Sequence, residues 1–172
     1  ITLGGGLAAA PASADFGIKS WQAGTCNKPD VLFVYQCTYS APSIDFYHQA
    51  AGHPVAGGTD FEVNTNGSGS PEGTLSQVRV DLPVGLNVNP QATPQCARAT
   101  FEANPADCAA SKVGVSVVYS VTSLLPLPLE FPVYNLVPDP GRPALFAFNA
   151  NVGLLGIDED IYLQADIAWD TD

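Results

Sequence analysis

Positive charge is scarce in this sequence. Of the 172 residues, 6 are Lys or Arg and 17 are Asp or Glu, which gives a formal net charge of -11. Charged residues make up 13% of the chain, well below the usual proportion of roughly a quarter. A chain of this sign repels phosphate backbones, so we expect no nucleic-acid partner.

Long apolar runs and methionine are absent as well. No run approaches the roughly 18 residues that a membrane-spanning helix requires, so the sequence predicts no membrane span. The hydrophobic share of 46% is nevertheless sufficient for a core and argues against disorder. The 16 glycines and 15 prolines, with many Val, Thr, Tyr and Phe, favour a β protein rich in turns.

The sequence also lacks the motifs of common catalytic sites. It contains no Gly-x-Ser-x-Gly element around a nucleophilic serine. Its two histidines, His48 and His53, have a spacing that places them together on neither a helix face nor a strand face. A loop in which His53 and Pro54 shape a turn explains them as well. We therefore expect no enzyme activity, no catalytic residue and no cofactor.

The first residues are typical of the end of a secretion signal. Ala12, Ser13 and Ala14 form a small-x-small cleavage site before the acidic Asp15, and residues 1–7 resemble the tail of an apolar segment. We expect residues 1–14 to be a signal-peptide remnant and the mature protein to be secreted or held at the cell surface. If residues 1–14 are retained instead, they could pair with the sheet edge of a neighbouring copy.

Four cysteines, Cys26, Cys37, Cys96 and Cys108, allow three pairings. The local pairing, Cys26–Cys37 and Cys96–Cys108, closes two short loops that each lie within one segment, and we favour it. Zinc is a weaker interpretation, because no Cys-x-x-Cys pair is present and secreted thiols oxidise.

Alternation of apolar and polar residues with a period of two recurs along the chain and predicts strands. The alternating stretches are residues 60–64, 77–82, 113–121 and 161–168, and further strand candidates are residues 31–35 and 144–150. In one stretch we expect five residues to line a buried face: Val113, Val115, Val117, Tyr119 and Val121. Short helices are expected only around residues 99–104 and 47–51.

A proline-rich segment, residues 124–132, interrupts this pattern. Pro126, Pro128 and Pro132 lie among leucines. Proline cannot donate to a ladder, so we expect an edge strand or an extended arm rather than a central strand.

About eight short strands with regular turn signals predict an all-β fold. The expected architecture is an antiparallel β-sandwich, immunoglobulin-like in the broad sense, with a jelly roll as the alternative. We expect one domain over residues 15–172, in which residues 158–172 either close the sandwich or start a further module.

Two groups of residues are candidates for ligand binding. Asp158, Glu159 and Asp160 are dense enough to attract calcium, but they lack the ligand spacing of a calcium loop, and a solvated turn explains them. Trp21 and Tyr47 are candidates for stacking on a sugar, against the alternative that they pack in the core.

Several short segments of the sequence form a recognisable combination. They are Asp15-Phe16-Gly17-Ile18, Gln49-Ala50-Ala51-Gly52-His53-Pro54, Leu82-Pro83-Val84-Gly85-Leu86, Asn89-Pro90 and, after Cys96 and Cys108, Ser111-Lys112-Val113-Gly114. Together they resemble the N-terminal region of large secreted, multi-module, β-rich proteins of actinobacteria, over residues 15–151. The resemblance implies location and architecture, and it implies no activity.

These observations predict an extracellular structural or adhesion module without catalytic activity. The alternatives are a carbohydrate-binding module and a subunit of an extracellular fibre assembled by strand exchange. The expected partner is accordingly protein, either a second copy or a neighbouring module, or a surface glycan.

Overall fold

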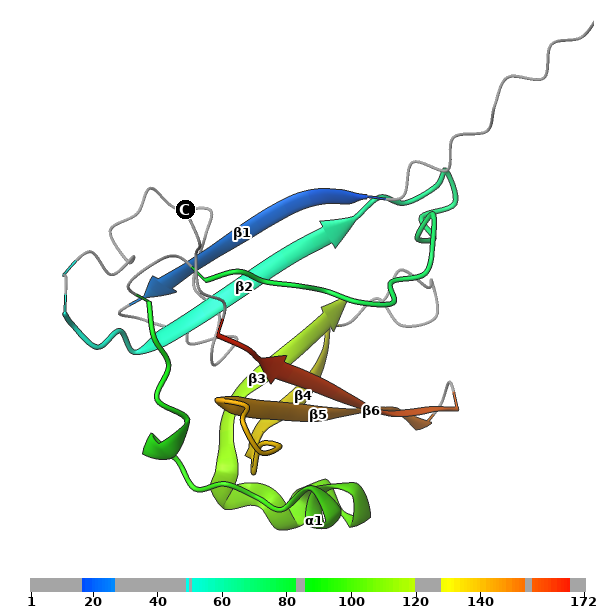
Figure 1. Cartoon of the computed structure of the whole chain (residues 1–172). Coiled ribbons are helices and arrows are strands. Elements are labelled where there is room, and N and C mark those ends of the chain that lie inside the picture. Colours follow the sequence, from blue (N-terminus) through cyan, green and yellow to red (C-terminus); the bar gives the residue numbers. More distant parts are fainter. Residues whose placement is uncertain are drawn as a thin grey trace, which may run out of the picture. The chain divides into compact units, whose positions relative to one another are not determined.

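The computed structural model describes residues 17–26, 49, 51–82, 86–119, 128–153 and 156–167. The chain divides into two compact units, with the boundary between Arg79 and Val80. The described part is mostly β, with two antiparallel sheets of two and four strands, few helices and one disulfide (Figure 1). The prediction of a β protein is therefore confirmed, and none of the described helices is long and apolar enough to cross a membrane.

The first unit contains a ribbon of β1 (Ile18–Cys26) and β2 (Ala56–Val63). Trp21 opposes Phe61 in the ladder. On β2 the predicted alternation is confirmed, because Phe61 and Val63 are half-buried whereas Asp60 and Glu62 are exposed. The ribbon thus has an apolar face and a polar face.

Residues 77–82 do not form the predicted strand. Val78, Val80 and Leu82 are all exposed. Alternation alone does not make a strand, because a strand also needs a neighbour that satisfies its backbone groups.

The second unit is built on a four-stranded antiparallel sheet in the order β3 (Lys112–Tyr119), β4 (Pro128–Leu136), β5 (Ala144–Val152) and β6 (Ile157–Ala165). Three short helical elements precede it: η1 (Pro90–Ala92), α1 (Arg98–Ala103) and η2 (Pro105–Ser111). The expected strand over residues 144–150 and the expected helix over residues 99–104 are both confirmed.

The core of this unit lies between α1, η2 and one face of the sheet, which we call the helix face (Figure 1). Phe101 of α1 is fully buried, and its ring centroid lies 5.8 Å from that of Tyr134 and 6.2 Å from that of Tyr162. The other buried members of the cluster are Cys108, Leu136, Leu145 and Ala147. Burial of one large aromatic ring therefore fixes the position of α1 on the sheet.

The predicted disulfide between Cys96 and Cys108 is confirmed, with a Cα–Cα distance of 5.6 Å. It joins a residue just before α1 to a residue within η2, and so holds α1 and the start of η2 against the core. Cys37 and the side chain of Cys26 lie outside the described residues, as do residues 1–14, residues 31–35, Val121 and residues 124–127.

The face of β6 that packs in the core is opposite to the one that its aliphatic residues suggest. Register pairs Ala147 with Tyr162, which places Tyr162 on the helix face. Ile161 and Leu163 project from the other side, and Leu163 is 47% exposed. The aromatic ring rather than the aliphatic residues fills the space beside Phe101.

The prediction of a buried face on β3 is wrong for Val113 and Tyr119, and it is untested for Val121, which lies outside the described residues. Val113 is 42% exposed and Tyr119 is 61% exposed, while Val115 and Val117 are half-buried. The ladder with β4 shifts register between Lys112 and Gly114. Among the described strands, β3 lies at the edge of the sheet, so its side chains have a neighbour on one side only.

Strand β4 lies between β3 and β5 in the sheet order, but its described proline-rich residues, 128–132, pair with β3 and not with β5, as expected for an edge. The prolines of β4 remove no hydrogen bond between the strands, because of the side to which each nitrogen points. The Asn135 carbonyl accepts a hydrogen bond from the Cys96 amide, and the Val137 amide donates one to the Cys96 carbonyl. Cys96 lies on the β3 side of β4, so the odd-numbered residues of β4 direct their backbone groups toward β3. Pro128 and Pro132 direct theirs toward β5, whose pairing with β4 runs only from Tyr134 to Leu136. No ladder hydrogen bond is lost at either proline.

Candidate functional site

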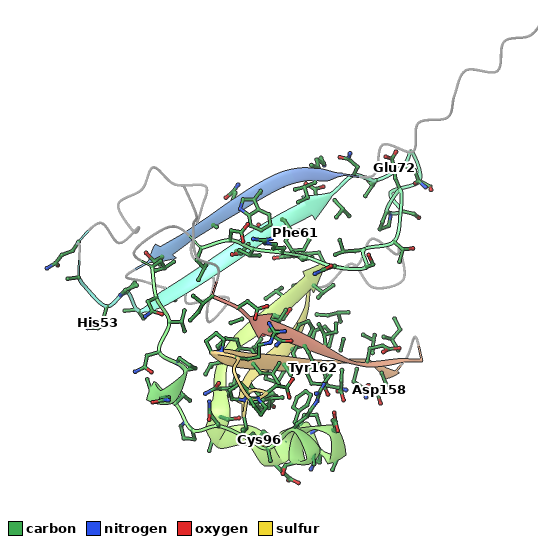
Figure 2. The ribbon with its side chains drawn as sticks, viewed as in Figure 1. His53, Phe61, Glu72, Cys96, Asp158 and Tyr162 are labelled. Carbon is green, nitrogen blue, oxygen red and sulfur yellow. A yellow bond between two sulfur atoms is a disulfide. The ribbon has the colours of Figure 1, made fainter. Side chains whose placement is uncertain are left out.

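Polar residues replace apolar ones toward the far end of the helix face. On β5, Leu145 and Ala147 are followed at the same spacing by Asn149 and Asn151, which oppose Asp160 and Asp158 of β6. These side chains and the end of α1 line a pocket of about 330 Å³, whose lining residues are Glu102, Ala103, Pro105, Asn149, Asn151, Asp158 and Asp160. Figure 2 labels Asp158 and Tyr162 along β6. The register of one hairpin therefore sets most of the chemistry of the pocket.

Asn149 joins the two aspartates. Its Nδ2 donates to Oδ1 of Asp158 at 2.9 Å and to Oδ1 of Asp160 at 2.8 Å. Glu159 lies between them on the strand and points to the opposite face, because successive side chains of a strand alternate. Of the three acidic residues that the sequence marked as calcium candidates, the structure thus brings two together.

The three acidic residues also lie within strand β6, not in the turn that the sequence suggested. Among the described residues, no three His, Cys, Asp or Glu side chains are grouped so that they could hold a metal ion. The arrangement is suited to accepting hydrogen bonds from hydroxyl or amide donors of a ligand.

Glu102 connects α1 to β6 at the border of the pocket. Its Oε1 accepts a hydrogen bond from the Tyr162 hydroxyl at 2.9 Å and from Nε of Arg98 at 3.1 Å. The Arg98 guanidinium lies 4.3 Å from the centroid of the Tyr162 ring. Burial raises the pKa of the Tyr162 hydroxyl above its ordinary value, and the negative charge of Glu102 raises it further.

A second candidate site lies on the β1–β2 ribbon. The rings of Trp21 and Phe61 are 5.8 Å apart between centroids and are inclined by 19°. Trp21 is 40% exposed. On the neighbouring positions, Nζ of Lys19 donates to Oε1 of Glu62 at 2.6 Å. The ribbon therefore presents an exposed indole on its apolar face, while the Lys19–Glu62 pair belongs to the polar face.

Of the remaining candidates, His53 alone lies among the described residues. His53 is exposed at the end of the segment before β2 (Figure 2). Tyr47 and His48 lie outside the described residues. No contact among the described residues joins His53 to a nucleophile or to an acidic group.

Sequence reasoning missed Glu102, Asn149 and Asn151. A signal for the asparagines was present, since they continue the spacing of Leu145 and Ala147 and so mark the point where one face of β5 turns polar. For Glu102 there was none, because its partner Tyr162 is 60 positions away.

Comparison with known proteins gives no match. No family model matches the sequence, and neither a curated protein nor a solved structure matches it. The resemblance over residues 15–151 therefore stays an expectation, and the function is argued from the residues themselves.

Proposed function

We propose that the chain is an extracellular structural or adhesion module without catalytic activity. The observation that carries the proposal is the Cys96–Cys108 disulfide. Structural disulfides persist in oxidising compartments and are rare in the cytoplasm. In the chain-entropy model a loop of this length contributes roughly 3 kcal/mol, a gain typical of modules that must stay folded outside the cell.

The four-stranded sheet further supports an antiparallel sandwich, immunoglobulin-like in the broad sense, as the architecture of the module. The face opposite the helix face carries Phe131 and Phe148, whose rings stack with centroids 6.1 Å apart, and also Phe146, Ile161 and Leu163. A sheet that is apolar on both faces needs a covering layer on each. An experimental structure in which water covers this second face would contradict the sandwich.

The location is tested on the native protein. If the chain is secreted, N-terminal sequencing of material from the culture medium or the cell surface yields Asp15 as the first residue. Intact mass before and after alkylation then shows no free thiol. Recovery of the protein in the cytoplasm with reduced cysteines would contradict the proposal.

A carbohydrate-binding module is the second candidate, and Trp21 is the observation that favours it. Its exposed indole is nearly parallel to the ring of Phe61, and sugar rings stack on such apolar surfaces. Affinity electrophoresis in gels that contain soluble polysaccharides tests this candidate. Trp21→Ala should abolish any retardation, whereas Leu75→Ala, at another exposed apolar residue, should leave it unchanged.

A further inference from the structure

The two edges of the four-stranded sheet differ in charge. The edge strand β6 carries three carboxylates in nine residues, those of Asp158, Glu159 and Asp160. The opposite edge strand, β3, has Lys112 as its one charged residue among eight. Charged side chains are a common means by which proteins prevent edge strands from pairing. Acidic charge therefore protects β6, whereas on β3 Lys112 and the register shift beside it lie at one end of the strand and leave residues 114–119 in regular pairing with β4.

The direction of the backbone groups of β3 follows from its register with β4. Gly114, Ser116 and Val118 oppose odd-numbered residues of β4 and direct their amides and carbonyls toward it. Val115, Val117 and Tyr119 therefore direct their backbone groups away from the described sheet. Of the described strands, only β4 pairs with β3. These three residues present the donors and acceptors that a further strand would use.

We propose that β3 pairs antiparallel with β3 of a second copy of this chain, with Val117 opposite the Val117 of that copy. In this register Val115 opposes Tyr119 of the second copy, and Tyr119 opposes Val115 of the second copy. All three outward residues of each strand therefore take part. The contact is isologous and closes as a two-fold dimer. It joins two four-stranded sheets into one, and it goes beyond the proposed function, since it requires only the edge of β3.

Charge favours β3 over β6 for such a contact. Each copy carries a net charge of -11, so two copies repel one another. Pairing through β6 would add the three carboxylates of each strand to the interface. Pairing through β3 places no acidic residue in it, and screening by salt should strengthen the dimer because it weakens the overall repulsion.

The test compares two proline variants by light scattering after size exclusion, at concentrations up to about 1 mM, where weak dimers are detected. Val117→Pro removes an outward amide and no bond to β4, as Pro128 and Pro132 do on β4. We expect the wild type to have the mass of a dimer and Val117→Pro that of a monomer. Gln164→Pro, which removes an outward amide of β6, is the matched control and should stay dimeric.

A charge pair keeps the test decisive if Val117→Pro fails to fold. Val117→Glu and Val117→Lys should each be monomeric alone, because like charges meet at the two-fold axis. An equimolar mixture should regain the dimer mass. A monomeric wild type, a dimer that survives Val117→Pro, or a mixture that stays monomeric would overturn the proposal.

A truncated variant that begins at Asp15 distinguishes this contact from assembly through donated N-terminal strands. If β3 pairs with β3, removal of residues 1–14 leaves the dimer intact. Loss of the dimer on this truncation would assign the contact to residues 1–14 and would overturn the pairing proposed above.

Discussion

Nδ2 of Asn135 donates a hydrogen bond to the carbonyl oxygen of Pro90 across 2.7 Å, although 45 positions separate the two residues. The same amide lies 3.2 Å from the carbonyl of Thr93, and the Asn135 side chain is fully buried. One side chain of β4 therefore satisfies the carbonyls of the segment that leads into α1.

Replacing Asn135 with Asp should destabilise the protein strongly. The substitution removes the donor and leaves a carboxylate facing carbonyl oxygens in a buried site, which we expect to cost about 3–5 kcal/mol. Urea denaturation measures the change in the free energy of unfolding. Asn87→Asp, at an exposed position, is the matched control and should stay within about 0.5 kcal/mol of the wild type. Equal stability of the two variants would contradict the assigned role of Asn135.

The double variant Cys96→Ser/Cys108→Ser should lose about 2–4 kcal/mol, since the unfolded chain regains the freedom that the disulfide removes. The midpoint of urea unfolding measures this loss. Any further decrease on adding dithiothreitol to the variant would report the predicted Cys26–Cys37 bond. A variant as stable as the wild type would show that packing around Phe101 alone holds α1 in place.

Tyr162→Ala should be much more destabilising than Leu163→Ala. Tyr162 packs against Phe101 in the core, and removing its ring should cost about 2–4 kcal/mol. Leu163 is exposed on the other face, so its truncation should cost less than about 1 kcal/mol. Thermal unfolding of the two variants checks the facing of β6, and the reverse order would show that the aliphatic residues are the buried ones.

The hydroxyl of Tyr162 should ionise only above the ordinary tyrosine pKa of about 10, because burial and Glu102 raise its pKa. A pKa that is higher in the folded state than in the unfolded state means that the folded state holds the proton more tightly. The associated stability is complete below the unfolded-state pKa and is lost as the pH rises through the folded-state pKa.

Ultraviolet titration of wild type and Tyr162→Phe identifies this step. Burial also raises the pKa of Tyr134, so Tyr134→Phe is measured in parallel. Glu102→Gln should lower the pKa of Tyr162, because it removes a nearby negative charge. An unchanged titration in Glu102→Gln would contradict the contact between the two residues.

Local signals in the sequence were sufficient for some elements. The short helix at residues 98–103 and the loop closed by Cys96 and Cys108 depend on neighbours in sequence, and both were predicted. The turn between β4 and β5 also depends on neighbours in sequence: it contains Pro140 and Gly141, with a φ of 85° at the glycine, and the Arg142 amide donates to the Asp139 carbonyl across it.

Other features depend on which strands become neighbours. The facing of β6 is set by the pairing of Tyr162 with Ala147, and the exposure of Val113 by the position of β3 at an edge. The one-sided pairing of the proline-rich part of β4 was predicted, but the pairing of Tyr134 to Leu136 with β5 was not. Proline prevents hydrogen bonding only to the neighbouring strand toward which its nitrogen points. The register decides which strand that is.

The Cys96–Cys108 bond also determines how the chain bears load. Tension along the backbone passes from residue 96 to residue 108 through the disulfide, so α1 and the first part of η2 bear no load and cannot be pulled out. The sequence separation of 12 between the cysteines corresponds to roughly 40 Å of extended chain. While the disulfide is intact, a stretched molecule cannot lengthen by this amount. Reduction of the disulfide would make the additional length available.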